Sequence, residues 1–234
     1  GVQTCALPIY NVESFVVNGA IGDIMNPYVI SFASDITQSY NLQSGWNWYS
    51  TYIEVEGSEG LGMMQEGLGD DAIQIKSHSS GFVNYEAGIW FGGLTEIKNE
   101  EMYMIKMSSS HVLEMTGSYG DPSAHPITLG TNWKWIGYPV NATMSVSEAL
   151  SNLSPNNGDY VKSQFHFAQY YEGLGWTGTL GVMEPGRGYM YQNTSGTVKT
   201  LVYPTPSSKG TMVSNVTTEN NRWVADGREY PTNM

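Results

Sequence analysis

The residues of this chain that could carry out hydrolysis are two glutamates in similar surroundings. Glu86 and Glu172 each follow a tyrosine in two segments that resemble one another, and paired carboxylates carry out glycoside hydrolysis. Each segment offers a single glutamate at this place, and no acidic partner recurs beside it. A salt bridge to Lys76 or Lys162, or a capped turn, is therefore the simpler interpretation of both side chains.

The four histidines form no recognisable catalytic or metal-binding pattern. A nucleophilic triad requires a serine or cysteine, a histidine base and an orienting carboxylate, and the sequence contains no Gly-x-Ser-x-Gly motif. No two histidines have the His-x-x-x-His spacing of a metal site. We therefore predict that the chain is not an enzyme and binds no cofactor, and we assign no role to its histidines, which are His78, His111, His125 and His166.

Two oxygen-rich turns leave calcium binding open. Asp70-Asp71 and Asn156-Asn157-x-Asp159 fall at corresponding places, and calcium takes six to eight oxygen ligands from such loops. Neither turn matches the Asp-x-Asp-x-Asp-Gly loop, and asparagine, aspartate and glycine are also the ordinary residues of tight turns. No metal site is assigned.

The strongest signal in the sequence is an internal repeat of about eighty-five residues. Leu42–Trp48 resembles Leu129–Trp135, and the similarity continues at a nearly constant offset. The tryptophans fall in register, which chance does not explain. The residues that define the repeat are Trp46, Trp48, Tyr85, Glu86 and Tyr103 in the first copy, and Trp133, Trp135, Tyr171, Glu172 and Tyr189 in the second.

Both copies predict a strand, a short helix and then three or four more strands. The first strand is expected over Trp46–Ile53 and over Trp133–Val140, where tryptophan, tyrosine, isoleucine and valine dominate. In the second copy Ser145 is a candidate N-cap with Glu148 three residues on. The corresponding segment Gly57–Gly69 is rich in glycine, which predicts a weaker helix.

The fold class is therefore mainly β, with two tandem homologous small β-sandwich or barrel modules that each hold one short helix. Residues 1–9 resemble a translated sequencing adapter, and residues 10–40 are interpreted as the end of a preceding β module. Repeat 1 is expected over 41–122 and repeat 2 over 123–208. Residues 209–234 are interpreted as a linker and the start of a following module.

Composition and charge exclude several function classes. Lys and Arg total 10 against 22 Asp and Glu, which gives a net charge of -12 in 234 residues. Phosphate binding needs clustered basic residues, so a nucleic-acid partner is not expected. Charged residues make up only 14% of the chain, whereas Tyr, Trp and Gly are abundant, which is typical of an exported β protein. No apolar run is long enough to span a membrane.

Aromatic residues are the remaining candidates for binding. Trp46 and Trp48 lie two positions apart and share one face of a strand, which we expect to be buried in the core. Aromatic rings outside the repeat signature, among them Trp223, are freer to stack on a sugar or on a protein surface. The candidate ligand-binding residues are Trp90, Tyr138, Trp176 and Tyr191.

With these residues in view, the chain resembles a repeated module of secreted, multidomain surface proteins of Bacteroidota-type bacteria. The resemblance covers about residues 42–204 and consists of Gly-Trp-Asn-Trp at 45–48, Gly175-Trp176, and Pro-Gly-x-Gly-Tyr-Met at 185–190. The first copy departs from the last motif, with Asn99–Met104 in its place. Such modules are architectural or adhesive parts of large proteins, often exported by a type IX route, and the resemblance carries no catalytic residue.

Three interpretations of function follow. The leading one is a non-catalytic structural or adhesive repeat region of a large secreted or cell-surface bacterial protein. The alternative is a carbohydrate-binding module that is accessory to a glycan-degrading enzyme. The third is a hydrolase with an active site in one copy, for which Glu172 is the only candidate. The expected partner is a polysaccharide or another surface protein, and the expected location is extracellular or at the cell surface.

Overall fold

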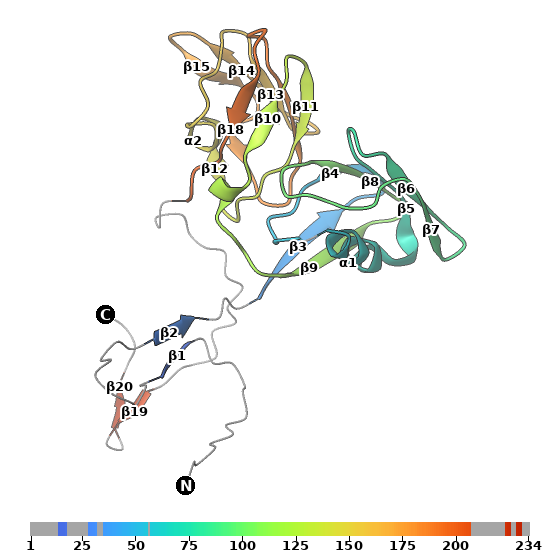
Figure 1. Ribbon diagram of the computed structural model, residues 1–234, viewed down its shortest axis with the longest axis vertical. Coiled ribbons are helices and arrows are strands. Elements are labelled where there is room, and N and C mark those ends of the chain that lie inside the picture. Colours follow the sequence, from blue (N-terminus) through green and yellow to red (C-terminus); the bar gives the residue numbers. More distant parts are fainter. Residues whose placement is uncertain are drawn as a thin grey trace.

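A computed structural model of the chain describes residues 14–17, 28–31, 35–55, 57–206, 223–225 and 228–230. In this part of the chain the protein is mainly β, and its sheets are antiparallel. Two bodies of similar build follow one another (Figure 1), which confirms the predicted fold class. We call them module 1, residues 36–117, and module 2, residues 127–203.

Module 1 combines a five-stranded sheet, a two-stranded ribbon and one α-helix. The sheet has the order β4-β8-β5-β6-β7, and the ribbon pairs β3 with β9. The sheet is open at β4 and β7, so it is not a barrel. The elements are β3 (Ile36–Leu42), β4 (Gly45–Tyr49), α1 (Glu59–Leu68), the 3-10 helix η1 (Gly69–Asp71), β5 (Ala72–Lys76), β6 (Phe82–Glu86), β7 (Ile89–Gly92), β8 (Tyr103–Met107) and β9 (His111–Gly117).

Module 2 has the same main sheet and ribbon, with an additional short ribbon in which β12 pairs with β16. Its sheet has the order β11-β17-β13-β14-β15, and β10 pairs with β18 as β3 pairs with β9. The elements are β10 (Ile127–Leu129), β11 (Trp133–Ile136), β12 (Met144–Ser145), α2 (Val146–Ala149), β13 (Tyr160–Lys162), β14 (Phe167–Tyr171), β15 (Gly175–Gly178), β16 (Val182–Met183), β17 (Tyr189–Gln192) and β18 (Lys199–Leu201). A linker with the 3-10 helix η2 (Pro122–Ala124) joins the modules.

The core of each module lies between the sheet on one side and the ribbon and helix on the other. In module 1, Leu113 of the ribbon and Met64 of α1 belong to one cluster with Ile105 of the sheet. In module 2, Leu201 of the ribbon, Ala149 of α2 and Val161 of the sheet likewise belong to one cluster. Burying these side chains supplies the main stabilisation, at about 25 cal/mol per Å² of apolar surface.

The tryptophans of β4 and β11 lie on the outer faces of the sheets. In β4 the buried side chains are Asn47 and Tyr49, and alternate residues of a strand point to opposite faces. The prediction that Trp46 and Trp48 face the core is therefore wrong. Large buried tyrosines occupy the inner side in place of these tryptophans: Tyr49, Tyr103, Tyr138, Tyr189, Tyr191 and Tyr203. The outward tryptophans are Trp46 at 40% exposure, Trp133 at 36%, and the half-buried Trp48 and Trp135.

The strand register also corrects the alignment of the two copies. Tyr85 lies opposite Trp90 in the β6–β7 hairpin, and Tyr170 lies opposite Trp176 in the β14–β15 hairpin. Tyr170 is therefore the counterpart of Tyr85, and the predicted match with Tyr171 is displaced by one residue. The loop before β14 is one residue shorter than the loop before β6, and the turn after β14 is one residue longer. The two changes cancel, so the numbering offset between the two copies is the same before and after these hairpins.

The prediction that the first copy has the weaker helix is wrong. Helix α1 has 10 residues and α2 has 4. The glycines of α1 are packing residues, because a Cβ at Gly60 would lie 2.6 Å from Val55 and one at Gly67 would lie 2.8 Å from Leu113. Close approach to the core thus offsets the low helix propensity of glycine. In α2 the predicted N-cap is confirmed, since Ser145 Oγ accepts a hydrogen bond from the Glu148 N–H.

Module 1 begins before residue 41. Strand β3 pairs with β9 along its whole length, from Ile36 opposite Gly117 to Leu42 opposite His111. Residues 36–40, which the sequence assigns to a preceding module, therefore belong to the first repeat. Further out, β1 (Ser14–Val17) pairs with β2 (Tyr28–Ser31), and β19 (Trp223–Ala225) pairs with β20 (Arg228–Tyr230). Residues 1–9 lie outside the described part.

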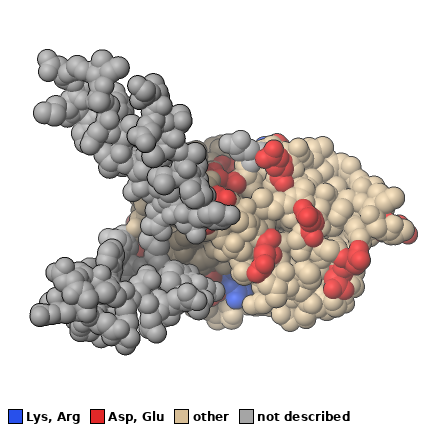
Figure 2. All heavy atoms as spheres, turned by 90° about the horizontal axis from the view of Figure 1, so that it is seen from below, with Lys and Arg blue, Asp and Glu red and all other residues tan. Residues whose placement is uncertain are grey.

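Acidic side chains are spread over the face shown in Figure 2, and the basic ones visible there are fewer. This distribution agrees with the net charge of -12. In the described residues no helix is both long enough and apolar enough to cross a membrane.

The β6–β7 turn generates a stability prediction. Ala87 has a φ of 52° and precedes Gly88 with a φ of 83°, and a left-handed alanine costs about 1–2 kcal/mol relative to a right-handed one. Ala87→Gly should raise the free energy of unfolding by up to about 1 kcal/mol in urea denaturation. Ala124→Gly in η2, where φ is not positive, is the matched control and should lower it by about 0.4–1 kcal/mol. Equal losses in both variants would contradict the strain at Ala87.

Candidate functional site

The two modules contact each other through equivalent elements in a reciprocal way. The N–H of Ser50, just after β4, donates to the carbonyl of Gly186 in module 2 at 3.1 Å. Its counterpart Gly137, just after β11, donates to the carbonyl of Glu100 in module 1 at 2.9 Å. Glu100 and Gly186 occupy the same place in the repeat, three residues before the Tyr-Met pair that both copies contain. Each module thus receives from the other the contact that it gives, as in a two-fold arrangement.

Glycine permits the close approach at this interface. A Cβ at Gly137 would lie 2.0 Å from the Asn99 carbonyl oxygen, and one at Gly188 would lie 2.0 Å from the Met102 side chain. Met102 and Gly188 are counterparts in the repeat, and Met102 is fully buried. The Met102 side chain of module 1 therefore fills the space that its counterpart Gly188, which has no side chain, leaves in module 2.

Side chains near the centre of the interface bridge the two backbones. Ser50 Oγ accepts a hydrogen bond from the Tyr138 N–H at 3.1 Å and donates to the Arg187 carbonyl at 2.7 Å. The Gln164 amide donates to the Trp46 carbonyl at 2.7 Å and accepts from the Trp48 N–H at 3.1 Å. The loop of module 2 that holds Gln164 thereby lies along the edge of β4, where the Trp48 carbonyl also accepts a hydrogen bond from the Gly188 N–H at 3.2 Å.

The outward tryptophans take part in the same interface. The His78 ring of module 1 stacks on Trp135 of module 2 with centroids 5.4 Å apart. The Lys162 ammonium lies 4.8 Å from the ring centroid of Trp133 and 5.7 Å from that of Trp48. A cation near the ring faces of two modules is attracted by both quadrupoles. Trp48, Trp133 and Trp135 thus lie outside the cores but take part in the contact between the modules.

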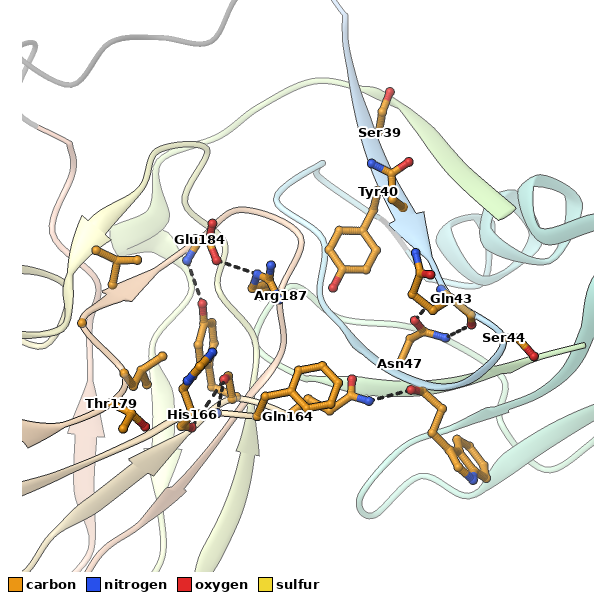
Figure 3. A pocket seen from close by; sticks show the side chains of 18 residues that line it. Ser39, Tyr40, Gln43, Ser44, Asn47, Gln164, His166, Thr179, Glu184 and Arg187 are labelled. Atoms are coloured by element: carbon orange, nitrogen blue, oxygen red, sulfur yellow. Dashed lines mark hydrogen bonds and ion pairs between the residues drawn. The ribbon is translucent and has the colours of Figure 1, made fainter. Parts of the chain in front are cut away.

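A cleft of about 750 Å³ opens where the two modules meet. Figure 3 shows Tyr40 and Gln43 of module 1 on one side and His166, Glu184 and Arg187 of module 2 on the other. The volume lies within the range of small-molecule sites. The cleft is lined by Ser39, Tyr40, Asn41, Gln43, Ser44, Trp46 and Asn47 from module 1, and by Ser163, Gln164, Phe165, His166, Thr179, Leu180, Gly181, Val182, Glu184, Arg187 and Tyr189 from module 2.

The charges in the cleft compensate each other. Arg187 Nε lies 2.6 Å from Glu184 Oε2, and these are the charged residues among those described that line the cleft. Burial raises the pKa of Tyr40, although the nearby Arg187 opposes this. The Tyr40 phenol therefore stays protonated at neutral pH and can donate a hydrogen bond.

The predicted ligand-binding residues do not come together. Tyr138 and Tyr191 are fully buried in the core of module 2 and cannot stack on a ligand. Trp90 and Trp176 are half-buried, and each packs against the core of its own module. Trp90 also borders a hollow of about 450 Å³ beside α1, whereas the inter-module cleft contains none of these four residues.

Glu86 and Glu172 are exposed residues of hairpin turns. Glu86 pairs with Ile89 at the end of β6, whereas Glu172 follows β14 and its N–H donates to Asn157 Oδ1. The corrected register makes them non-equivalent, so they are not a shared acidic position. No ion pair joins either one to Lys76 or Lys162 in the described residues.

Asp159, one of the residues considered for calcium, is a buried structural anion. Lys199 Nζ lies 2.7 Å from its Oδ2, the Tyr191 hydroxyl donates to the same oxygen at 2.7 Å, and Thr194 donates twice to Oδ1. Burial opposes ionisation, but the Lys199 ammonium and the N–H groups of Asn156 and Thr194 lower the pKa of Asp159 to about 2. A lysine ammonium thus already supplies the positive charge, and no cluster of metal ligands occurs among the described residues.

His125 binds the linker to module 1. Its Nδ1 lies 2.8 Å from Glu100 Oε1 and its Nε2 lies 3.0 Å from Glu54 Oε1. The hydrogen bond to Glu100 contributes most to raising the pKa of His125 to about 9; burial opposes the rise and Glu54 adds to it. Elsewhere, His111 Nε2 lies 2.7 Å from the Gly67 carbonyl. These two histidines have structural partners.

The cleft residues Tyr40, Phe165 and Arg187 were missed in the sequence. The sequence assigns Tyr40 to a preceding module, and Arg187 is only the variable position of the Pro-Gly-x-Gly-Tyr-Met motif at 185–190. Phe165 carries no separate signal, because Phe165 and Phe167 alternate with polar residues as in a strand.

The buried ion pair generates a mutational prediction. Asp159→Asn keeps the shape of the side chain but leaves the Lys199 ammonium, whose side chain is only 12% exposed, beside a neutral amide. The free energy of unfolding should fall by about 3–5 kcal/mol in urea denaturation. Glu172→Gln, at an exposed position, should stay within about 0.5 kcal/mol of the parent. A loss at Asp159 no larger than this would show that the pair does not stabilise module 2.

His125 generates a pH prediction. Its pKa is raised from 6.5 to about 9 on folding, so its stabilising contribution is complete below pH 6.5 and disappears as the pH rises through 9. The melting temperature of His125→Gln should therefore lie below that of the parent at pH 6, and the two should converge by pH 10. His166→Gln, which changes an exposed ring, should match the parent throughout. A gap at His125 that does not change with pH would exclude a charged histidine.

Comparison of the chain with protein-family models, with curated proteins and with solved structures finds no match in any of the three.

Proposed function

We propose that this chain is a non-catalytic structural or adhesive repeat region of a large secreted or cell-surface bacterial protein. The observation that carries the proposal is the reciprocal interface, in which Ser50 and Gly137 each donate to the other module. Backbone hydrogen bonds, close glycine contacts and stacked rings join two homologous modules at a defined angle. Such a pair holds whatever it carries in a set position and orientation, which is the task of an architectural segment.

Asp159, His125 and Glu184 support a non-catalytic role because each is engaged in the structure. Asp159 is neutralised by Lys199, and His125 lies between Glu54 and Glu100. The cleft carboxylate of Glu184 pairs with Arg187. Each of these three groups is held by a partner of opposite sign, which stabilises the fold and leaves the group poorly suited to exchange protons with a substrate.

Composition supports the proposed location. Charged residues are 14% of the chain and the net charge is -12, and the motifs at Gly45–Trp48 and Pro185–Met190 resemble those of exported surface modules. A low content of charge with many aromatic residues suits a module that works outside the cell, where it contacts polysaccharide or other surface proteins.

The fixed angle between the modules can be tested by pulsed dipolar spectroscopy. Spin labels at Ser110→Cys and Ser151→Cys, in a Cys5→Ser background, report the distance between exposed sites of the two modules. The parent should give one narrow distance distribution. Gly137→Ala should broaden it, because the added Cβ would lie 2.0 Å from a backbone oxygen of module 1 and overpacking costs about 1–3 kcal/mol.

Gly130→Ala is the matched control, since a Cβ there meets no atom within 4 Å. Its distance distribution should equal that of the parent. A broad distribution in the parent itself would show two flexibly tethered modules and would remove the observation that carries the proposal.

A further inference from the structure

Three aromatic rings flank the inter-module cleft and are accessible from it. Phe165 is 76% exposed and Trp46 is 40% exposed, while Tyr40 is half-buried. Leaving rings of this size in water is unfavourable at about 25 cal/mol per Å². Exposed aromatic side chains gathered at a concave site are a feature of binding surfaces.

The fold does not require two of these rings. By strand register, the counterpart of Tyr40 in module 2 is Ile127, because both lie opposite a leucine of the ribbon partner. The counterpart of Phe165 in module 1 is Ser79, next to the matched pair His78 and Gln164. Both modules fold with the same topology of the main sheet, so an aromatic residue at these places is not needed for that topology. Phe165 has no core contact of this kind, whereas Tyr40 also packs against the core of module 1, with its ring 5.4 Å from that of Tyr49.

The electrostatics of the cleft favour an uncharged ligand. Glu184 and Arg187 pair with each other at 2.6 Å, and the surrounding chain carries a net charge of -12. An anionic polymer would be repelled by this field, and a cationic one would have to break the ion pair. A neutral molecule meets neither penalty.

The hydrogen-bonding groups of the cleft favour a ligand rich in hydroxyls. The side-chain amides of Asn41 and Gln43 and the hydroxyl of Thr179 both donate and accept. The Tyr40 phenol stays protonated and donates. A sugar hydroxyl is likewise both donor and acceptor, and the C–H faces of a pyranose ring are apolar enough to stack on Phe165 and Trp46.

We propose that the inter-module cleft binds a neutral oligosaccharide segment of a polysaccharide. A sugar ring stacks on Phe165 of the module 2 wall and on Trp46 of the module 1 wall, while Tyr40, Asn41 and Gln43 of module 1 hydrogen-bond its hydroxyls. This deepens the adhesive part of the proposed function, and it rests on that proposal because the two walls come from different modules.

The test is calorimetric titration of the chain with neutral hexasaccharides that differ in sugar and linkage, namely cellohexaose, laminarihexaose, xylohexaose, mannohexaose and chitohexaose. A hexagalacturonate is the anionic comparator, and an array of neutral glycans extends the set. The expected result is binding to at least one neutral glycan and weaker binding to the hexagalacturonate.

Variants based on the other repeat assign the site. Phe165→Ser and Tyr40→Ile replace each ring by its counterpart, so both should fold, and each should weaken binding about tenfold or more. Leu174→Ala changes a side chain that is 80% exposed in the β14–β15 turn and lies outside the cleft. This variant should bind like the parent.

Three outcomes would overturn the proposal: no binding to any neutral glycan, binding to the hexagalacturonate alone, or undiminished binding by both ring variants. A narrow spin-label distance in a chain that binds no neutral glycan would remove the saccharide site and leave the structural role standing. A broad distance distribution together with glycan binding that depends on Phe165 would instead remove the structural role and leave the saccharide site standing.

Discussion

The exchange of backbone hydrogen bonds between the modules is the constraint on which the rest of the arrangement depends. Strands β4 and β11 lie at the edge of their sheets, and an exposed edge invites pairing with other chains. Each of these edges is covered by the other copy, through Gly186 on one side and Glu100 on the other. The cleft and the tryptophan contacts lie beside this mutual covering.

The same contact explains why the two copies have diverged where they meet. Counterpart residues near a two-fold axis approach one another, so identical large side chains there would collide. Met102 faces Gly188, and Ser50 lies beside the segment of Gly137. Module 1 therefore has the Met102 side chain and the Ser50 hydroxyl at the positions where module 2 has the glycines Gly188 and Gly137.

The sequence predicted the duplication, the β class and the cap at Ser145 because each depends on local chemistry or on in-register similarity. It did not predict which face of β4 is buried, since Trp46 and Trp48 alternate with Asn47 and Tyr49, and both faces carry large rings. Propensity was misleading for α1, where glycines are retained for packing against Val55 and Leu113.

The candidate site was beyond prediction for a different reason. Its walls come from two modules, and no pattern within one repeat shows how the repeats meet. Tyr40 and Phe165 are far apart in the chain. They line one cleft only because contacts such as that of Gln164 with the edge of β4 bring the two modules together.

The reciprocal contact is self-limiting. A head-to-tail interface leaves one surface free at each end and can be extended without limit, whereas a contact in which both partners use the same surface is complete at two. A third module of this kind would find the edges of β4 and β11 already covered. A longer protein built from these modules would therefore consist of successive two-module units, each with its own reciprocal contact. Duplication of a single module would leave one module with an uncovered strand edge.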